Sequence, residues 1–167
     1  MKKWFFLCAI SALIFSACDK SGNSSTDCTQ AVPTGIATAA ETAYLQNYLA
    51  ANGITNATEK NGMYYVIATQ GTGLSPNQCS NISMDYVGKI MMPTSDGTQF
   101  DASQPGQPFS SQLYNLIVGW KLILPLVKSG GTVTLYIPPS MGYGATGQGS
   151  IPGNSYLKFQ ITLRAVQ

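Results

Sequence analysis

The chain has 167 residues, a length that suits one domain with additional segments rather than two full domains. Charged residues make up 10% of it and the formal net charge is +2, which excludes a strongly basic nucleic-acid-binding protein. The chain contains no histidine, so histidine-activated nucleophiles and histidine-ligated metal sites are excluded. Its 17 glycines and 9 prolines favour short strands joined by many turns.

The N-terminus has the features of an export signal. Two lysines precede an uncharged apolar run from Trp4 to Phe15, and the small residues Ser16 and Ala17 follow. A helix that spans a bilayer needs about 20 apolar residues, so a permanent membrane anchor is the weaker interpretation. Residues 1–17 are therefore predicted to be a cleaved signal peptide.

Cys18 lies directly after these small residues. The stretch from Ile14 to Cys18 resembles the lipobox of bacterial lipoproteins, which implies lipidation of Cys18 and anchoring to a membrane of the bacterial cell envelope, periplasmic or at the outer membrane. An ordinary signal peptide and a soluble secreted protein are the alternative. Residues 18–36 are rich in Ser, Thr, Gly and Asn, a composition that predicts a flexible tether.

Two cysteines remain for the folded part of the chain, because Cys8 belongs to the signal peptide and Cys18 to the lipid anchor. An exported protein folds in an oxidising compartment, where a disulfide between Cys28 and Cys79 would contribute about 4 kcal/mol in the chain-entropy model. Two free thiols are the alternative, since the sequence gives no distance between them. A four-cysteine metal site is excluded, and no metal is expected.

Residues 38–52 predict an N-terminal helix. They lack Pro and Gly, Ala40, Tyr44 and Tyr48 recur every four residues, and Asn52 with Gly53 forms a stop signal. The aromatic face is predicted to pack on the domain or on a second copy of the chain, so a homodimer through this helix stays open. Residues 37–58 thus form a helix and linker before a domain at 59–167.

From Gly62 onward apolar and polar residues alternate, which is typical of antiparallel strands with one buried face. The pattern covers residues 64–69, 82–89, 132–137 and 157–164. Residues 116–124 instead have the spacing of a short helix that ends at Pro125. Together these segments predict an α+β fold, with an antiparallel sheet of about five strands wrapped around one short helix.

The sequence offers no pair of carboxylates, metal cluster or activated nucleophile. The glycine-rich stretch 142–147 precedes no predicted helix, so it does not match a dinucleotide-binding fingerprint, and no cofactor is expected. Large apolar side chains lie in or beside predicted loops instead. They indicate an apolar pocket with one or two polar groups.

The sequence from Met63 to Gln167 resembles the FKBP-type peptidyl-prolyl cis-trans isomerases. The matching pieces occur in the family's order at residues 86–88, 96–103, 108–109, 116–120, 137–138, 142–147, 151–152 and 157–159. Each piece alone is a weak signal, whereas the ordered set is specific. The resemblance implies a five-stranded antiparallel sheet around a short helix, and an isomerase that acts on proline-containing polypeptides without a cofactor.

The resemblance also implies roles for individual residues. Trp120 would form the floor of a proline pocket, and Asp101 would lie near the substrate backbone. Tyr143 and the amide of Ile117 would each donate a hydrogen bond to a substrate carbonyl. The other residues expected to bind substrate are Tyr86, Phe100, Phe109, Leu116, Ile151 and Phe159.

The sequence departs from the family pattern in several places. Ser111 stands where a second aromatic residue is common, Gly153 replaces the second proline of an Ile-Pro-Pro stretch, and residues 91–95 are extra. The extra residues predict a longer hairpin away from the pocket. The predicted function is a prolyl isomerase that assists the folding of exported proteins at the bacterial envelope. The alternative is a non-catalytic FKBP-like chaperone or a peptide-binding lipoprotein.

Overall fold

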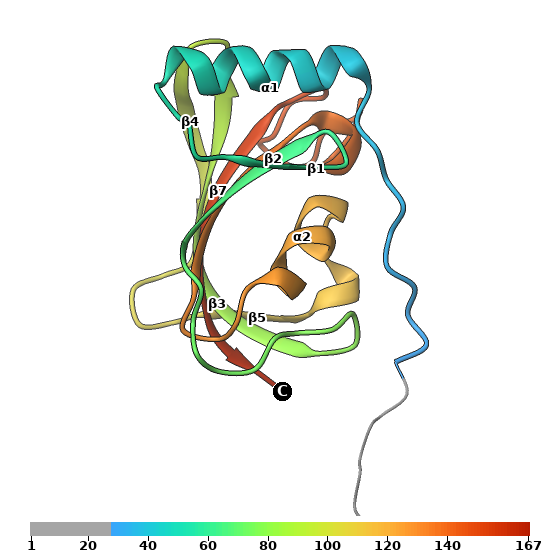
Figure 1. Cartoon of the computed structure of the whole chain (residues 1–167), viewed down its shortest axis with the longest axis vertical. Coiled ribbons are helices and arrows are strands. Elements are labelled where there is room, and N and C mark those ends of the chain that lie inside the picture. The colour runs from blue at the N-terminus through green and yellow to red at the C-terminus, as the bar shows by residue number, and fades with distance from the viewer. Residues whose placement is uncertain (1–27) are drawn as a thin grey trace, which may run out of the picture.

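The computed structural model describes residues 28–167 (Figure 1). The predicted signal peptide, the lipidation site Cys18 and the first part of the predicted tether lie outside the described residues. The regular elements, in chain order, are α1 (Ala39–Ala51), β1 (Thr58–Lys60), β2 (Met63–Thr69), β3 (Asn81–Met92), β4 (Ser95–Ala102), β5 (Phe109–Gln112), η1 (Leu113–Asn115), α2 (Val118–Ile123), η2 (Leu124–Leu126), β6 (Thr132–Ile137), η3 (Pro139–Met141) and β7 (Leu157–Val166). No helix in this part of the chain has the length and apolar character needed to cross a membrane.

The strands form a single antiparallel sheet in the order β1-β2-β6-β7-β3-β4, with β5 paired to the first residues of β3. The sheet curves around α2, as Figure 1 shows. This arrangement confirms the predicted fold class. Two short strands, β1 and β5, extend the sheet beyond the five strands that the sequence predicts.

The main core lies between the curved sheet and α2. Alternate residues of β6 and β7 point into it, so that Val133, Leu135, Leu157 and Ile161 are buried while their strand neighbours are less so. Ile123 of α2 is fully buried against them. The period-two pattern of the sequence therefore identified the core-facing residues of both strands. Tyr136, on the opposite face of β6, is also buried, in a second cluster with α1.

Helix α1 begins and ends where the sequence predicts. Thr38 is its N-cap, in a capping box with Glu41, and Asn52 is its C-cap. Leu45 and Tyr48 are fully buried in a second cluster, on the side of the sheet that also presents Tyr136. The aromatic face thus packs on its own domain, one of the two destinations predicted for it, and a homodimer stays a prediction.

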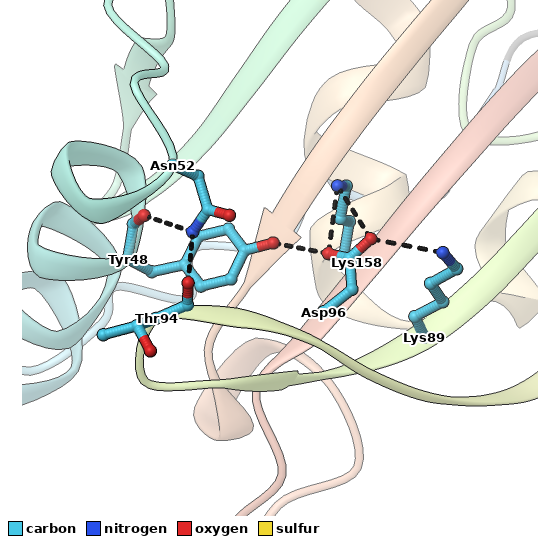
Figure 2. Close-up of polar contacts among 6 residues, drawn as sticks. All are labelled: Tyr48, Asn52, Lys89, Thr94, Asp96 and Lys158. Carbon is cyan, nitrogen blue, oxygen red and sulfur yellow. Dashed lines mark hydrogen bonds and ion pairs between the residues drawn. The ribbon is translucent and has the colours of Figure 1, made fainter.

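A polar network fastens α1 to the sheet (Figure 2). The Tyr48 hydroxyl donates a hydrogen bond to the carboxylate of Asp96 at 2.5 Å. Lys158 and Lys89 contact the same carboxylate at 3.0 and 3.2 Å. Asp96 lies on β4, at the hairpin that contains the extra residues 91–95. This hairpin is thus a contact surface within the chain, away from the pocket described below.

The segment before α1, residues 28–38, runs beside α2 in Figure 1, and we call it the strap. Its first residue, Cys28, is joined to Cys79 by a disulfide with Cα atoms 5.6 Å apart. Near its other end the side-chain amide of Asn61 donates to the carbonyl of Gly35 at 3.0 Å. The Ala37 amide donates to the carbonyl of Asn61 at 2.9 Å. The strap is therefore held against the domain at both ends.

Candidate functional site

A cavity of about 560 Å³ opens between the sheet, the start of α2 and the loop that follows η3. Its volume is within the usual range of small-molecule and peptide pockets. The residues that line it are Tyr86, Asp101, Phe109, Asn115, Leu116, Ile117, Trp120, Gly142, Tyr143, Thr146, Gly147, Gln148 and Phe159.

Strand β3 brings distant parts of the chain together at this cavity. It pairs with three strands, so Gly88 lies opposite Asp101 of β4 and opposite Phe159 of β7, while Met84 lies opposite Phe109 of β5. A long strand with partners on both edges can place side chains from all three on one face. The site depends on this register rather than on any local motif.

The wall and floor of the cavity are a set of aromatic rings packed edge to face. Trp120 is only 4% exposed, and its ring centroid lies 4.9 Å from that of Phe159 at 90° and 5.5 Å from that of Tyr86 at 75°. Tyr86 meets Phe109 in the same manner at 5.7 Å. Such contacts stabilise aromatic pairs beyond the burial of their area. The cavity therefore has a preformed apolar floor.

Asp101 supplies a carboxylate at the edge of these rings. Its Oδ2 accepts a hydrogen bond from the Tyr86 hydroxyl at 2.5 Å, and its Oδ1 accepts one from the Ala102 amide at 2.9 Å. Burial and then the contact with Asp101 raise the pKa of Tyr86 well above its usual value. Burial, with the charge of Asp101 adding to it, also raises the pKa of Tyr143. Both hydroxyls are thus protonated donors at neutral pH.

Ile117 places a backbone donor at the start of α2. It is the N-cap of the helix and has extended backbone angles, and its carbonyl accepts the amides of Trp120 and Lys121. Its own amide has no acceptor among residues 28–167. An amide of this kind is available to a ligand carbonyl, because the first N–H groups at a helix start have no partner within the helix.

The structure brings together most of the residues predicted for the site. Those that line the cavity are Asp101, Tyr143, Trp120, Tyr86, Phe109, Leu116, Ile117 and Phe159. Phe100 and Ile151 are not among the residues that line the cavity. Phe100 packs edge-on behind Phe159, with ring centroids 5.5 Å apart, and fills the space left by Gly88. Ile151 is 7% exposed and belongs to the main core.

The sequence prediction missed most of the wall that the loop after η3 contributes, namely Gly142, Thr146, Gly147 and Gln148. It also missed Asn115, the last residue of η1. The glycine-rich composition of 142–147 was the available signal. Gly147 has φ +72°, and a side chain there would collide with the Ile151 carbonyl.

Ser111 and Gly153, two departures from the family pattern, do not line the cavity. A Cβ at Gly153 would collide with the Ala145 carbonyl, so the tight loop leaves no room there for the proline that the family pattern suggests. Ser111 lies on β5 opposite Ile82 and is not among the lining residues. Neither residue therefore removes a group that the cavity presents.

The family model for FKBP-type peptidyl-prolyl cis-trans isomerases matches residues 73–164, more than half of the chain. The isomerase FkpA of Escherichia coli strain K12 is 35% identical over 111 residues, which are 66% of this chain and 40% of that protein. FkpA of Buchnera aphidicola subsp. Baizongia pistaciae is 38% identical over 107 residues, or 64% of this chain and 41% of that protein. The chain thus spans less than half the length of these curated relatives.

Solved structures agree with the sequence match. The crystal structure of a peptidyl-prolyl cis-trans isomerase from Pseudomonas syringae pv. tomato superposes with a TM-score of 0.64 at 30% identity, over 81% of this chain and 99% of that one. Escherichia coli FkpA superposes with a TM-score of 0.63 at 29% identity, over 76% of this chain and 62% of that one. With this sheet, this helix and this order of motifs, the chain belongs to the FKBP-type peptidyl-prolyl cis-trans isomerase family.

Proposed function

We propose that this protein is a peptidyl-prolyl cis-trans isomerase whose cavity receives a proline ring against Trp120. The observation that carries the proposal is the composition of the cavity: a floor of edge-to-face aromatic rings, with one carboxylate and unpaired donors at its rim. The substrate class is a proline-containing polypeptide, and no cofactor takes part in the reaction.

The reaction needs no acid, base or nucleophile, because no covalent bond breaks. Rotation about an X-Pro bond crosses a barrier of about 20 kcal/mol and takes tens of seconds or more without a catalyst. The planar amide owes its rigidity to charge separation between nitrogen and oxygen, which the twisted transition state loses. An apolar pocket therefore binds the twisted state more tightly than the planar one, which accelerates the rotation.

In this proposal the polar groups hold the substrate while the bond rotates. The free amide of Ile117 donates to one substrate carbonyl, and the hydroxyl of Tyr143 donates to another. Asp101, fixed by the Tyr86 hydroxyl, faces the substrate backbone beside the proline. Holding the groups on either side of the X-Pro bond lowers the entropic cost of reaching the twisted geometry.

We further propose that the enzyme assists the folding of exported proteins at the bacterial cell envelope, anchored through lipid on Cys18. The lipobox-like residues 14–18 and the signal-like sequence before them support this location. The Cys28–Cys79 disulfide is also consistent with an oxidising compartment. Mass spectrometry of the membrane-bound protein would test the anchor, since an unmodified Cys18 contradicts it.

The activity is tested by following cis-to-trans conversion of a short X-Pro peptide with the purified protein. We expect exchange faster than the uncatalysed rate, in proportion to enzyme concentration. Exchange at the uncatalysed rate would reject the proposed isomerase activity. If the protein still bound a proline-containing peptide, the alternative function, a non-catalytic chaperone or a peptide-binding lipoprotein, would be favoured instead.

A further inference from the structure

Helix α1 lies across the end of the domain, with the loop after β6 beneath its N-terminal half (Figure 1). Glu41, in the first turn of this helix, reaches that loop. Its Oε1 accepts the backbone amide of Ser140 at 2.9 Å, and its Oε2 accepts the Ser140 hydroxyl at 3.0 Å. The two residues are 99 positions apart in the sequence, so the contact is purely tertiary.

One carboxylate therefore caps two helices. Glu41 completes the capping box of α1 by accepting the amide of Thr38 at 2.9 Å. Ser140 lies in the first turn of η3, where an amide has no partner within its own helix. Burial opposes the charge of Glu41, but the bonds from Thr38 and Ser140 outweigh it and lower its pKa. The contact is therefore a charge-assisted one at neutral pH.

The contact lies immediately before the cavity wall. Gly142 and Tyr143, two and three residues after Ser140, both line the cavity. The carbonyl of Pro139 accepts the amides of Gly142 and Gly144 at 3.0 and 2.9 Å. Through these two hydrogen bonds, the position of η3 determines the position of Gly142 and Tyr143 in the cavity wall.

Helix α1 also contacts the far end of the same loop. The ring of Tyr44, one turn after Glu41, stacks on the ring of Tyr156 with centroids 3.7 Å apart and planes at 14°. The carbonyl of Tyr156 in turn accepts the amide of Met91 at 2.8 Å. The loop between η3 and β7 is thus held by α1 both where it leaves η3 and where it enters β7.

We propose that Glu41 is a positioning residue for the isomerase site: it fixes η3, and through η3 it holds Gly142 and Tyr143 where they meet the substrate. Glu41 itself does not line the cavity. The inference rests on the proposed function, since it assigns Glu41 a part in the same site. It gives α1, which lies outside the matched family region, an effect on catalysis through η3.

The test compares the purified wild-type chain with Glu41→Ala in two measurements. The first is amide hydrogen exchange at Ser140, Gly142 and Gly144, and the second is kcat and KM for an X-Pro peptide. We expect faster exchange at these amides and a fall in kcat/KM of about threefold to tenfold. Glu41→Gln keeps an acceptor oxygen for Ser140 and should recover part of both losses.

Two controls separate this role from general loosening of the helix. Thr38→Ala weakens the cap of α1 but leaves the Glu41–Ser140 contact, so kcat/KM should stay at the wild-type value. Glu59→Ala is the second control: it removes another carboxylate that accepts a backbone amide, that of Gly62, at a turn outside the cavity, and kcat/KM should again stay at the wild-type value.

Ser140→Ala tests the same contact if Glu41→Ala fails to fold. It deletes one of the two bonds between Glu41 and Ser140 without changing the cap of α1.

The outcomes distinguish the inference from the proposed function. An inactive wild-type chain would reject the function and, with it, this role of Glu41. If the wild type is active, unchanged exchange in Glu41→Ala would show that the carboxylate does not hold the loop. Faster exchange with wild-type kcat/KM would show a structural role alone. Either of the last two results overturns the inference and leaves the isomerase in place.

Discussion

At the scale of single residues, the polar chemistry of the cavity centres on Asp101. It is the one charged side chain among the described residues that line the cavity, and it fixes the hydroxyl of Tyr86. Asp101→Ala removes the acceptor and leaves the Tyr86 hydroxyl without this partner. Loss of a hydrogen bond to a charged group costs about 1.5 to 3 kcal/mol, so we expect kcat/KM for an X-Pro peptide to fall about tenfold or more.

Asp85→Ala is the matched control for this prediction. Asp85 lies on β3 of the same sheet and forms an ion pair with Arg164, but it does not line the aromatic cavity. Exposed ion pairs contribute little to stability, so this variant should keep the wild-type rate. Equal kcat/KM values for Asp101→Ala and Asp85→Ala would show that Asp101 has no specific role in the site.

The sequence predicted which aromatic residues gather at the site but not their order in depth. Phe100 and Phe159 lie in two widely separated motifs of one family pattern, and the resemblance assigns both of them to the pocket. Only the register of β4 and β7 on β3 decides that Phe159 faces the cavity while Phe100 packs behind it. The absence of a side chain at Gly88 is what makes room for that packing. Whether an aromatic side chain faces the cavity or packs behind it therefore depends on tertiary contacts, which no local sequence pattern reveals.

At the scale of elements, α1 and the long strands were predictable because their signals are local. The capping residues of α1 and the period-two alternation of β6 and β7 lie within the elements themselves. Strand β5, with four residues, has too short a pattern and exists because β3 offers a free edge. The loop after η3 depends on close backbone approaches at Gly147 and Gly153, which composition indicates only as a turn.

The attachment of α1 to the sheet should depend on pH through Asp96. Burial opposes the charge, but hydrogen bonds from Tyr48, Lys158 and Lys89 outweigh it and lower the pKa of Asp96 from 3.8 to about 2 (Figure 2). The ionised form is thus stabilised by folding. Its contribution is complete above the unfolded pKa of 3.8 and is lost as the pH falls through about 2.

We expect this group to contribute about 1 to 2 kcal/mol at neutral pH, after allowance for solvent screening of a partly exposed carboxylate. Urea unfolding of the wild type should show stability falling between about pH 4 and pH 2, and Asp96→Asn should flatten that part of the curve. Tyr48→Phe keeps the buried ring but loses the hydroxyl bond, so its curve should lie between the two. An Asp96→Asn curve parallel to that of the wild type would contradict the role of the network.

At the scale of the whole molecule, one disulfide closes the chain around its strap. Cys28 and Cys79 are 51 residues apart, and the segment between them contains the strap, α1, β1 and β2. In the chain-entropy model a loop of that length restricts the unfolded chain by about 4 kcal/mol. The bond therefore acts on stability through the unfolded state, and less through contacts in the folded one.

The double variant Cys28→Ser/Cys79→Ser should lower the free energy of unfolding by up to about 4 kcal/mol, measured by urea denaturation of the purified protein. Its kcat/KM for an X-Pro peptide should equal that of the wild type, because neither cysteine lines the cavity and the bonds of Asn61 to Gly35 and Ala37 still hold the strap beside α2. Equal unfolding free energies in the two proteins would show that the cross-link does not stabilise the fold. A lower kcat/KM at full stability would instead mean that the strap, released at Cys28, changes the start of α2, where Gly35 lies against Val118.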